Sequence, residues 1–172
     1  LTPTIWTIMR RFMDKRPYMV LPDGGLTLTT RGYSENVAHA VLLAARQPEA
    51  AAGQIYDCGD EHQLTMAQWI EVVGHAMDGE IEIISVPDQY AYPARGLMMF
   101  HGPSNHQLFD LYKVKSELGY RDIVPPLEAM ARTVHWYRDN PPVVTDQFAA
   151  DLAASYGLED AIAAVYRDAC EK

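Results

Sequence analysis

The chain has 172 residues, a length that suits one domain with its own hydrophobic core. It is 48% hydrophobic and 22% charged, which is the balance of a globular protein. The net charge of −9 argues against nucleic-acid binding, since phosphates need a basic surface, and no apolar run is long enough to suggest a membrane span. Two cysteines make no disulfide framework, so we expect reduced thiols and a cytoplasmic protein.

The first part of the chain predicts a helix, a β-hairpin and a second helix. A Thr-Pro start and apolar residues at helical spacing predict a helix over 3–14. An apolar run and an alternating run flank the turn Asp-Gly-Gly, which predicts a hairpin over 18–30. Ser34 is placed to cap a helix over 34–47.

The middle of the chain predicts a strand, a helix and another strand. Residues 54–58 resemble a short strand that ends at a glycine. A Thr-x-x-Gln capping box then opens a helix over 65–78, in which apolar residues recur at helical spacing. Residues 80–87 alternate between apolar and polar side chains and end at a proline, which predicts a strand.

The last part is expected to be helical after an irregular segment. Residues 88–107 are rich in aromatics, methionine, glycine and proline, as in a covering loop or part of a binding site. Asp110 and Gly119 are placed to cap the two ends of a short helix, and prolines bound a second helix over 126–139. The Ala-rich tail predicts two short helices broken at Tyr156-Gly157.

This order of elements predicts an α+β fold, because the strands are too few for a large doubly wound sheet. We expect a small lobe over residues 1–142, with a hairpin, short strands and several helices, and a helical C-terminal extension over 143–172. The sequence begins with Leu1 rather than Met, so we expect a piece of a longer protein.

Four stretches within residues 17–140 carry a resemblance to a known family. They are LPDGG, YSENVAHAVLLAA, GQIYDCGDEHQLTMAQWIEVVGHAMDG and FDLYKVKSELGYRDIVPPLEAMARTVHWYRDN. In this order they resemble the C-terminal, substrate-binding half of the extended short-chain dehydrogenase/reductases, the NAD-dependent epimerase/dehydratase family. Asn36 stands where the family usually has Asp, and Asp57 where it usually has Asn; both swaps keep a side-chain acceptor.

The resemblance implies an isomerase or oxidoreductase that acts on a sugar nucleotide or a similar polar carbonyl or hydroxyl substrate. The family binds its dinucleotide at a Gly-x-x-Gly-x-x-Gly turn and works with a Tyr-x-x-x-Lys pair. Neither motif occurs in the sequence. We therefore expect a substrate-binding region that is not catalytic alone, with NAD or NADP held by a missing N-terminal Rossmann half.

Two other interpretations stay open at this point. The rival interpretation is a stand-alone binding or interaction module that kept the substrate lobe and lost catalysis. An enzyme with all its chemistry in these residues would need a paired nucleophile and base, which the sequence does not offer. Separation from a cofactor half predicts bare apolar surface at Ile5, Ile8 and Phe12 and at residues 97–100, and hence self-association.

Five residues are candidates for contact with the substrate. In family members that act on nucleotide sugars, an arginine on the hairpin clamps the diphosphate, and Arg31 lies on the same strand face but two residues from the usual position. Arg95 stands where the family often has a second arginine, with Tyr92 as an apolar wall. Tyr33 and Tyr18 complete the expected pocket, and an ordinary surface or core role is the alternative for each residue.

The remaining chemistry-bearing residues point to no site. The spacing of the histidines matches no known metal-binding pattern, so no metal is expected. Trp69 and Trp136 are expected in the core. The acidic turn Gly59-Asp60-Glu61 has no obvious partner in the sequence.

Overall fold

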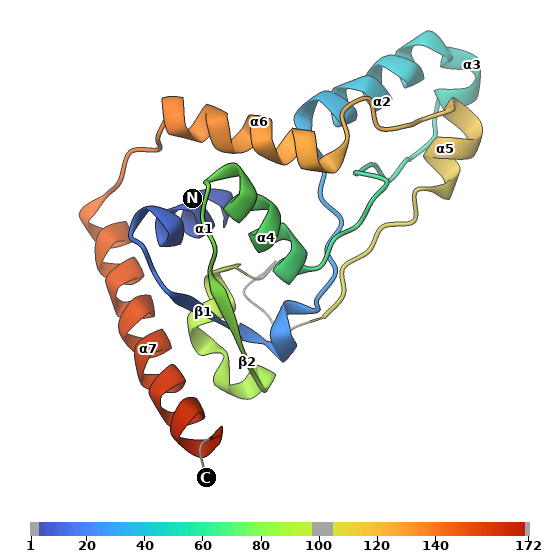
Figure 1. Cartoon of the computed structure of the whole chain (residues 1–172). Helices are drawn as coiled ribbons and strands as arrows, with labels where there is room; N and C mark the ends of the chain where they lie inside the picture. The colour runs from blue at the N-terminus through green and yellow to red at the C-terminus, as the bar shows by residue number, and fades with distance from the viewer. Residues whose placement is uncertain (1–3, 98–104, 171–172) are drawn as a thin grey trace.

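The computed structural model describes residues 4–97 and 105–170, apart from the side chains of residues 96 and 97. The fold is α+β, as expected: helices surround a two-stranded parallel sheet (Figure 1). Within the described ranges, no helix has the length and hydrophobicity that crossing a bilayer requires. The elements are α1 (Thr4–Met13), β1 (Tyr18–Pro22), η1 (Asp23–Gly25), α2 (Ser34–Arg46), α3 (Pro48–Ala51), α4 (Met66–Ala76), β2 (Glu82–Val86), η2 (Asp88–Tyr90), η3 (Tyr92–Leu97), α5 (Tyr112–Leu118), α6 (Pro126–Asp139) and α7 (Asp146–Cys170).

The predicted hairpin over 18–30 is wrong. β1 pairs with β2 in parallel, Met19 opposite Ile83 and Leu21 opposite Ser85. The Asp-Gly-Gly turn forms η1, and residues 26–30 make only isolated bridges. The physical reason lies in β1 itself, in which four of the five residues are buried, since such an unbroken apolar run is typical of a parallel strand covered on both faces.

Three smaller predictions are also wrong. Residues 54–58 form no strand; Ile55 is exposed, and its carbonyl accepts a hydrogen bond from Lys113 on α5. Ser34 is the first residue of α2, whose N-cap is Tyr33 and has no side-chain cap. The tail is one continuous helix, α7, because Gly157 lies in open space and nothing there forces a break.

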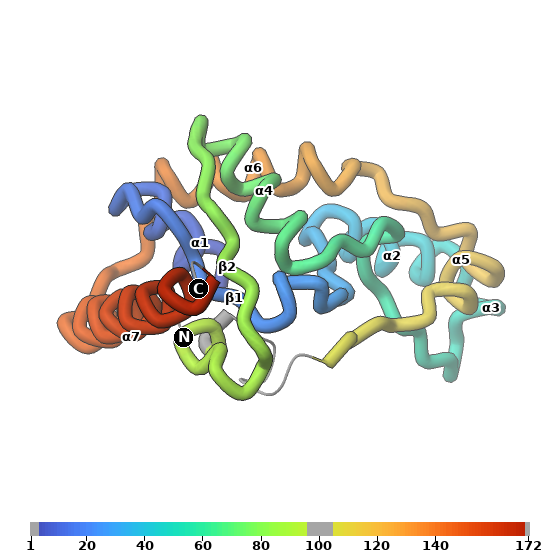
Figure 2. Tube along the Cα trace, turned by 60° about the horizontal axis from the view of Figure 1, so that its bottom comes forward, coloured from blue at the N-terminus to red at the C-terminus, as the bar shows by residue number. Residues whose placement is uncertain are grey.

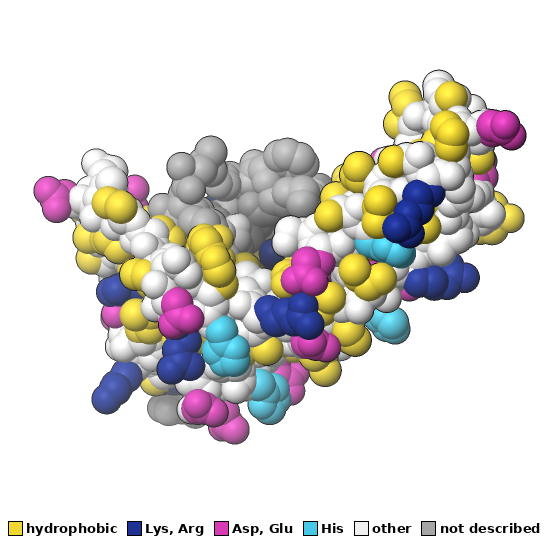
Figure 3. Space-filling model, turned by 90° about the horizontal axis from the view of Figure 1, so that it is seen from above, with side chains coloured by type: hydrophobic (Ala, Val, Ile, Leu, Met, Phe, Trp, Pro, Cys, Tyr) yellow, Lys and Arg dark blue, Asp and Glu magenta, His cyan; other side chains and the backbone are white. Residues whose placement is uncertain are grey.

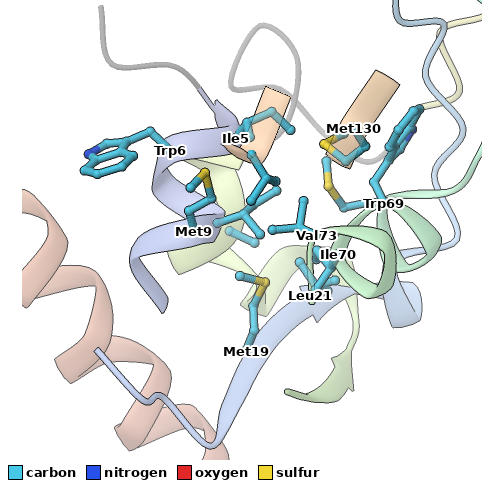
Figure 4. Close-up of a cluster of buried hydrophobic side chains, with 13 residues drawn as sticks. Ile5, Trp6, Met9, Met19, Leu21, Trp69, Ile70, Val73 and Met130 are labelled. Atoms are coloured by element: carbon cyan, nitrogen blue, oxygen red, sulfur yellow. The ribbon is translucent and has the colours of Figure 1, made fainter. Parts of the chain in front are cut away.

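The main hydrophobic cluster joins α1, β1, α4 and α6. It contains Ile8, Met9, Met19, Leu21 and Val73, each essentially without solvent exposure. Figure 4 shows Trp6 and Trp69 at opposite ends of this cluster, with Met130 of α6 beside Trp69. The helices α1, α4 and α6 therefore enclose one face of β1 and fix the position of the start of α4.

A second, smaller cluster joins α2, α3 and α5, which lie together at one end of the molecule (Figure 2). Tyr120 is fully buried there, and its hydroxyl donates to the carbonyl of Gly59 or the carboxylate of Asp122. Burial raises the pKa of Tyr120 well above its usual value, so the phenol stays protonated. This cluster holds the 58–61 turn against α5.

The helix α7 lies along the other side of the sheet, at the left of Figure 1. Ala163 and Ile162 pack on a cluster that includes Val20 and Ile84. Arg11 of α1 and Glu159 of α7 form a fully buried ion pair with a distance of 2.7 Å between nitrogen and oxygen. Burial raises the pKa of Glu159, and the charge of Arg11 opposes that rise. The helix is thus attached by both apolar contacts and buried charges.

Asn36 connects three parts of the chain from a fully buried position in the first turn of α2. Its amide nitrogen donates to the Asp60 carboxylate at 3.1 Å and to the Val124 carbonyl at 3.0 Å. Its amide oxygen accepts from the backbone N–H groups of Ile123 and Val124. Both donors and both acceptor sites of the amide are therefore used, and an aspartate, which lacks the donors, would not replace it.

Replacing Asn36 by the aspartate that the resembling family carries should destabilise this protein. The Asn36→Asp substitution places a second carboxylate against the buried Asp60 and removes both donated hydrogen bonds, which we expect to lower the free energy of unfolding by about 3 kcal/mol. Chemical denaturation measures the change. Asp57→Asn is the matched control, because Asp57 is exposed and should change stability by less than about 0.5 kcal/mol. A double variant with Asp60→Asn should recover part of the loss; equal loss in the single and double variants would contradict this account.

The buried pair between Arg11 and Glu159 should behave as a unit. Arg11→Met removes the hydrogen-bonded partner of the buried Glu159 carboxylate and leaves it only the more distant Arg16, at 3.8 Å, so we expect the substitution to cost about 3–5 kcal/mol. The double variant Arg11→Met/Glu159→Leu removes both charges and should be clearly more stable than Arg11→Met alone. Thermal unfolding of the parent, Arg11→Met, Glu159→Leu and the double variant at pH 7 measures this, and additive losses would show that the two charges are not coupled.

Candidate functional site

A cavity of about 240 Å³ opens where the beginnings of α2, α4 and α6 meet, and we call it the Arg31 cavity. Arg31 enters it from the segment before α2, and Trp69 enters it from α4. The guanidinium carbon of Arg31 lies 5.2 Å from the centre of the Trp69 ring, a cation–π arrangement. The other lining residues are Ile5, Gly32, Tyr33, Ser34, Asp60, Pro126, Ala129, Met130 and Thr133.

The charge on Arg31 is poorly solvated. Burial lowers the pKa of Arg31, and the nearby carboxylate of Asp60 only partly opposes this. The Nε atom of Arg31 is buried and has no hydrogen-bond partner in the described part of the chain; the same holds for the indole nitrogen of Trp69. A buried donor without a partner is costly, which is a reason to expect a ligand acceptor at this point.

Asp60 fixes one wall of the Arg31 cavity. Its side chain accepts hydrogen bonds from the backbone N–H of Tyr33 and from the Asn36 amide, and its backbone N–H donates to the Arg31 carbonyl. Gly59 lies so close to residues 30 and 31 that an added Cβ would come within 2.4 Å of Thr30. The tight approach of these two segments therefore depends on a glycine before Asp60.

The structure brings together two of the five candidates that the sequence suggested, Arg31 and Tyr33. Tyr18 lies elsewhere, beneath α7, where its hydroxyl donates to Asp160 at 2.7 Å. The guanidinium group of Arg167 lies 4.8 Å from the centre of its ring. Tyr18 thus takes part in the attachment of α7.

Arg95 and Tyr92 share the short helix η3. Arg95 donates two hydrogen bonds of 2.9 Å to the Asp88 carboxylate and a third to the Asp88 carbonyl. This pairing raises the pKa of Arg95. Tyr92 is about half exposed, and residues 98–104, which follow η3, lie outside the described residues. Neither residue lines the Arg31 cavity.

Two residues of the Arg31 cavity, Trp69 and Asp60, escaped the sequence interpretation, and the predicted position of a third residue, Trp136, was wrong. Trp69 is in the core, as expected, but one face also lines the Arg31 cavity. Trp136 is 57% exposed, so its assignment to the core is wrong; it lies beside the buried stripe of α6 formed by Met130 and Val134. Asp60 has partners that only the folded chain provides. The sequence did contain one signal that Trp136 is exposed, because Trp136 is offset from the apolar stripe of α6.

Two further expectations need correction. The apolar stripe of α1 is not bare, because Ile5 and Ile8 are buried in the main cluster and Phe12 packs against it. The second expected patch, residues 97–100, falls outside the described side chains. The acidic turn does have partners: Glu61 forms a 2.6 Å ion pair with Lys115. Among residues 4–97 and 105–170, no group of three His, Cys, Asp or Glu side chains is placed to hold a metal ion.

No family model matches the chain. A curated relative, the uncharacterized protein y4nL of Sinorhizobium fredii (strain NBRC 101917 / NGR234), is 27% identical over 154 residues. The match covers 78% of this chain and 43% of y4nL. The chain therefore spans less than half the length of that relative.

Solved structures show the same fold. The epimerase Mth375 of Methanothermobacter thermautotrophicus matches with a TM-score of 0.62 and 14% identity over 81% of this chain and 38% of its own. The dTDP-glucose 4,6-dehydratase of Bacillus anthracis str. Ames, in complex with NAD, matches with a TM-score of 0.55 and 14% identity. This match covers 80% of this chain and 40% of the dehydratase. DesIV of Streptomyces venezuelae, with NAD and TYD bound, matches with a TM-score of 0.54 and 22% identity, and the match covers 77% of this chain and 37% of DesIV. The chain thus has the fold of a part of NAD-dependent epimerase and dehydratase enzymes.

Proposed function

We propose that the chain supplies the substrate-binding part of an NAD(P)-dependent epimerase, dehydratase or reductase that acts on a sugar nucleotide or a similar polar carbonyl or hydroxyl compound. The observation that carries the proposal is that the structural match covers most of this chain but less than half of the matched enzyme. The match takes in 80% of this chain but 40% of a dehydratase in complex with NAD, which leaves most of that enzyme without a counterpart. The partner of this chain is accordingly a dinucleotide-binding part.

The motifs in the sequence indicate which part of the reaction this chain serves and which part needs the dinucleotide-binding part. Bound NAD or NADP would exchange a hydride with the substrate, which requires a close, fixed geometry and a group that moves the accompanying proton. The chain has neither the glycine-rich turn nor the Tyr-x-x-x-Lys pair for these tasks. Its own contribution is to bind the substrate, to orient it and to select it.

Arg31 and Tyr33 carry the substrate contacts in this proposal, because they line one cavity and the Nε of Arg31 has no hydrogen-bond partner among the described residues. Arg95 and Tyr92, both on η3, supply a second set of substrate contacts in the proposal. The bonds from Arg95 to Asp88 hold the guanidinium in a fixed orientation. Self-association stays an untested prediction, and the burial of the α1 stripe removes one of its two grounds.

The coding sequence upstream of Leu1 tests the proposal against the stand-alone module. We expect an open reading frame that encodes a strand, a Gly-x-x-Gly-x-x-Gly turn and a helix, followed by Tyr-x-x-x-Lys, all in frame with residues 1–172. A start codon directly before Leu1, with no such segment, would favour the binding module.

Replacing Arg95 by alanine in the natural full-length protein should weaken substrate binding more than tenfold and leave cofactor affinity unchanged, because a charge-assisted contact is worth about 1.5–3 kcal/mol. Steady-state kinetics and cofactor titration measure the two quantities. Asp88→Asn is the control: it keeps the shape of the side chain and the Arg95 charge. Equal losses in both variants would mean that Arg95 only shapes η3.

Replacing Arg31 should separate binding from stability. Arg31→Met removes a poorly solvated charge and no side-chain hydrogen bond that the described structure contains, so we expect a protein at least as stable as the parent. Substrate affinity in the full-length protein should nevertheless fall. Denaturation midpoints and binding titrations check the two outcomes. A large loss of stability would assign Arg31 to the fold rather than to a ligand.

A further inference from the structure

A cavity of about 500 Å³ opens between the second half of α7 and the segment that joins β2 to η2. We call it the α7 groove. Val86, Pro87 and Tyr90 form one wall, and apolar side chains of α7 form the other. None of the described residues that line it is charged. The face of α6 differs, since Figure 3 shows acidic and basic side chains next to one another there, with hydrophobic side chains between them. The α7 groove therefore suits an apolar surface rather than a charged or polyhydroxylated ligand.

The helix α7 presents apolar side chains to this groove at the spacing of a paired helix. Leu158, Ile162, Val165 and Ala169 follow one another at intervals of four, three and four residues, which places them in one line along the helix. This line differs from the face that is buried in the chain itself, to which Glu159 belongs. A helix that is apolar on two faces usually packs against a neighbour on both.

The groove leaves a sizeable apolar patch open to solvent. Val165 is 72% exposed, Tyr90 59% and Leu158 48%. An aromatic side chain alone has about 150–250 Å² of surface, so the lining residues together offer a contiguous patch of several hundred Å². A patch of that extent on a single chain is often an interaction site. None of its residues lines the Arg31 cavity, so the patch is separate from the proposed substrate contacts.

We propose that the α7 groove binds the α7 helix of a second copy of this chain, in antiparallel orientation, so that two copies form a symmetric dimer. A two-fold axis between residues 163 and 164 places Leu158 opposite the second copy's Ala169, and Ile162 opposite the second copy's Val165. Each layer then combines a larger side chain with a smaller one, which allows close packing. By the same symmetry, each α7 also covers the wall that Tyr90 forms in the other copy.

Three properties of the groove favour a second copy over another occupant. A two-fold contact uses the same patch on both copies, and the line along α7 is complementary to itself when it is reversed. The lining is uncharged, so the net charge of −9 on each copy does not oppose itself at the contact. The two patches together supply close to the roughly 1,000 Å² that a specific interface needs, whereas a small ligand would cover only part of them. The inference does not depend on the proposed function, and it gives self-association a different ground from the α1 stripe.

Sedimentation velocity of the chain between about 1 and 200 µM tests the association. We expect a monomer–dimer equilibrium that becomes stronger at high salt, because salt screens the repulsion between two acidic copies. Val165→Glu places a charge at the centre of the contact and should weaken the dimer at least about 100-fold. Val41→Glu is the matched control, because it adds the same charge at a valine that is 66% exposed on α2 and does not line the groove.

Disulfide formation tests the antiparallel register. Leu158→Cys and Ala169→Cys are made separately in a Cys170→Ser background. Neither protein should cross-link with itself, because residues 158 and 169 are about 16 Å apart along a helix. A mixture of the two should form a mixed disulfide dimer under mild oxidation. The remaining Cys58 is half-buried, and burial raises its pKa, so it is not expected to react.

Three results would overturn the inference. A monomer over the whole concentration range would mean that a second copy does not cover the groove, and an apolar molecule that co-purifies with such a monomer would assign the groove to a small ligand. Equal effects of Val165→Glu and Val41→Glu would place the contact elsewhere. Cross-linking of either cysteine variant with itself, or none in the mixture, would exclude this pairing of the helices even if Val165→Glu proves poorly folded.

Discussion

The buried contact between the Asn36 amide and the Asp60 carboxylate connects the parts of this fold that are distant in sequence. Asn36 belongs to α2, Asp60 to the turn after α3, and the carbonyl and N–H groups of Val124 to the segment that leads into α6. A fully used amide in a dry interior permits little displacement of its partners, because each lost hydrogen bond leaves a buried group unsatisfied. The starts of α2 and α6 are therefore held at one relative position.

That constraint also shapes the candidate site. Asp60 and Tyr33 line the Arg31 cavity, and the backbone N–H of Tyr33 donates to the same Asp60 oxygen that accepts from the Asn36 amide. Arg31, by contrast, has no comparable support, and burial disfavours its charge. The well-bonded Asn36 and the weakly supported Arg31 lie on the same short segment. A group that costs stability beside one that supplies it is the pattern expected where a ligand provides the missing interactions.

The sequence predicted elements whose signals are local. The capping box of Thr65 and Gln68 forms as expected, and the helices over 34–46 and 126–139 begin and end within a residue of their predicted limits. The strand partner of β1 could not be found in this way, because β2 lies 60 residues further along the chain and a nearby glycine turn favoured a hairpin. The cavity that Tyr33 and Trp136 both line was equally out of reach, since these residues are 103 positions apart and come to one cavity only when α2 and α6 are packed.

The central claim is that this chain binds substrate and depends on another part for the dinucleotide. Titration calorimetry with NAD, NADH, NADP and NADPH tests it most directly, on residues 1–172 and on the longer polypeptide that the proposal expects. The account predicts saturable dinucleotide binding by the longer polypeptide and none by residues 1–172. Saturable binding of any of the four dinucleotides by residues 1–172 alone would contradict it and would require a cofactor site within this lobe.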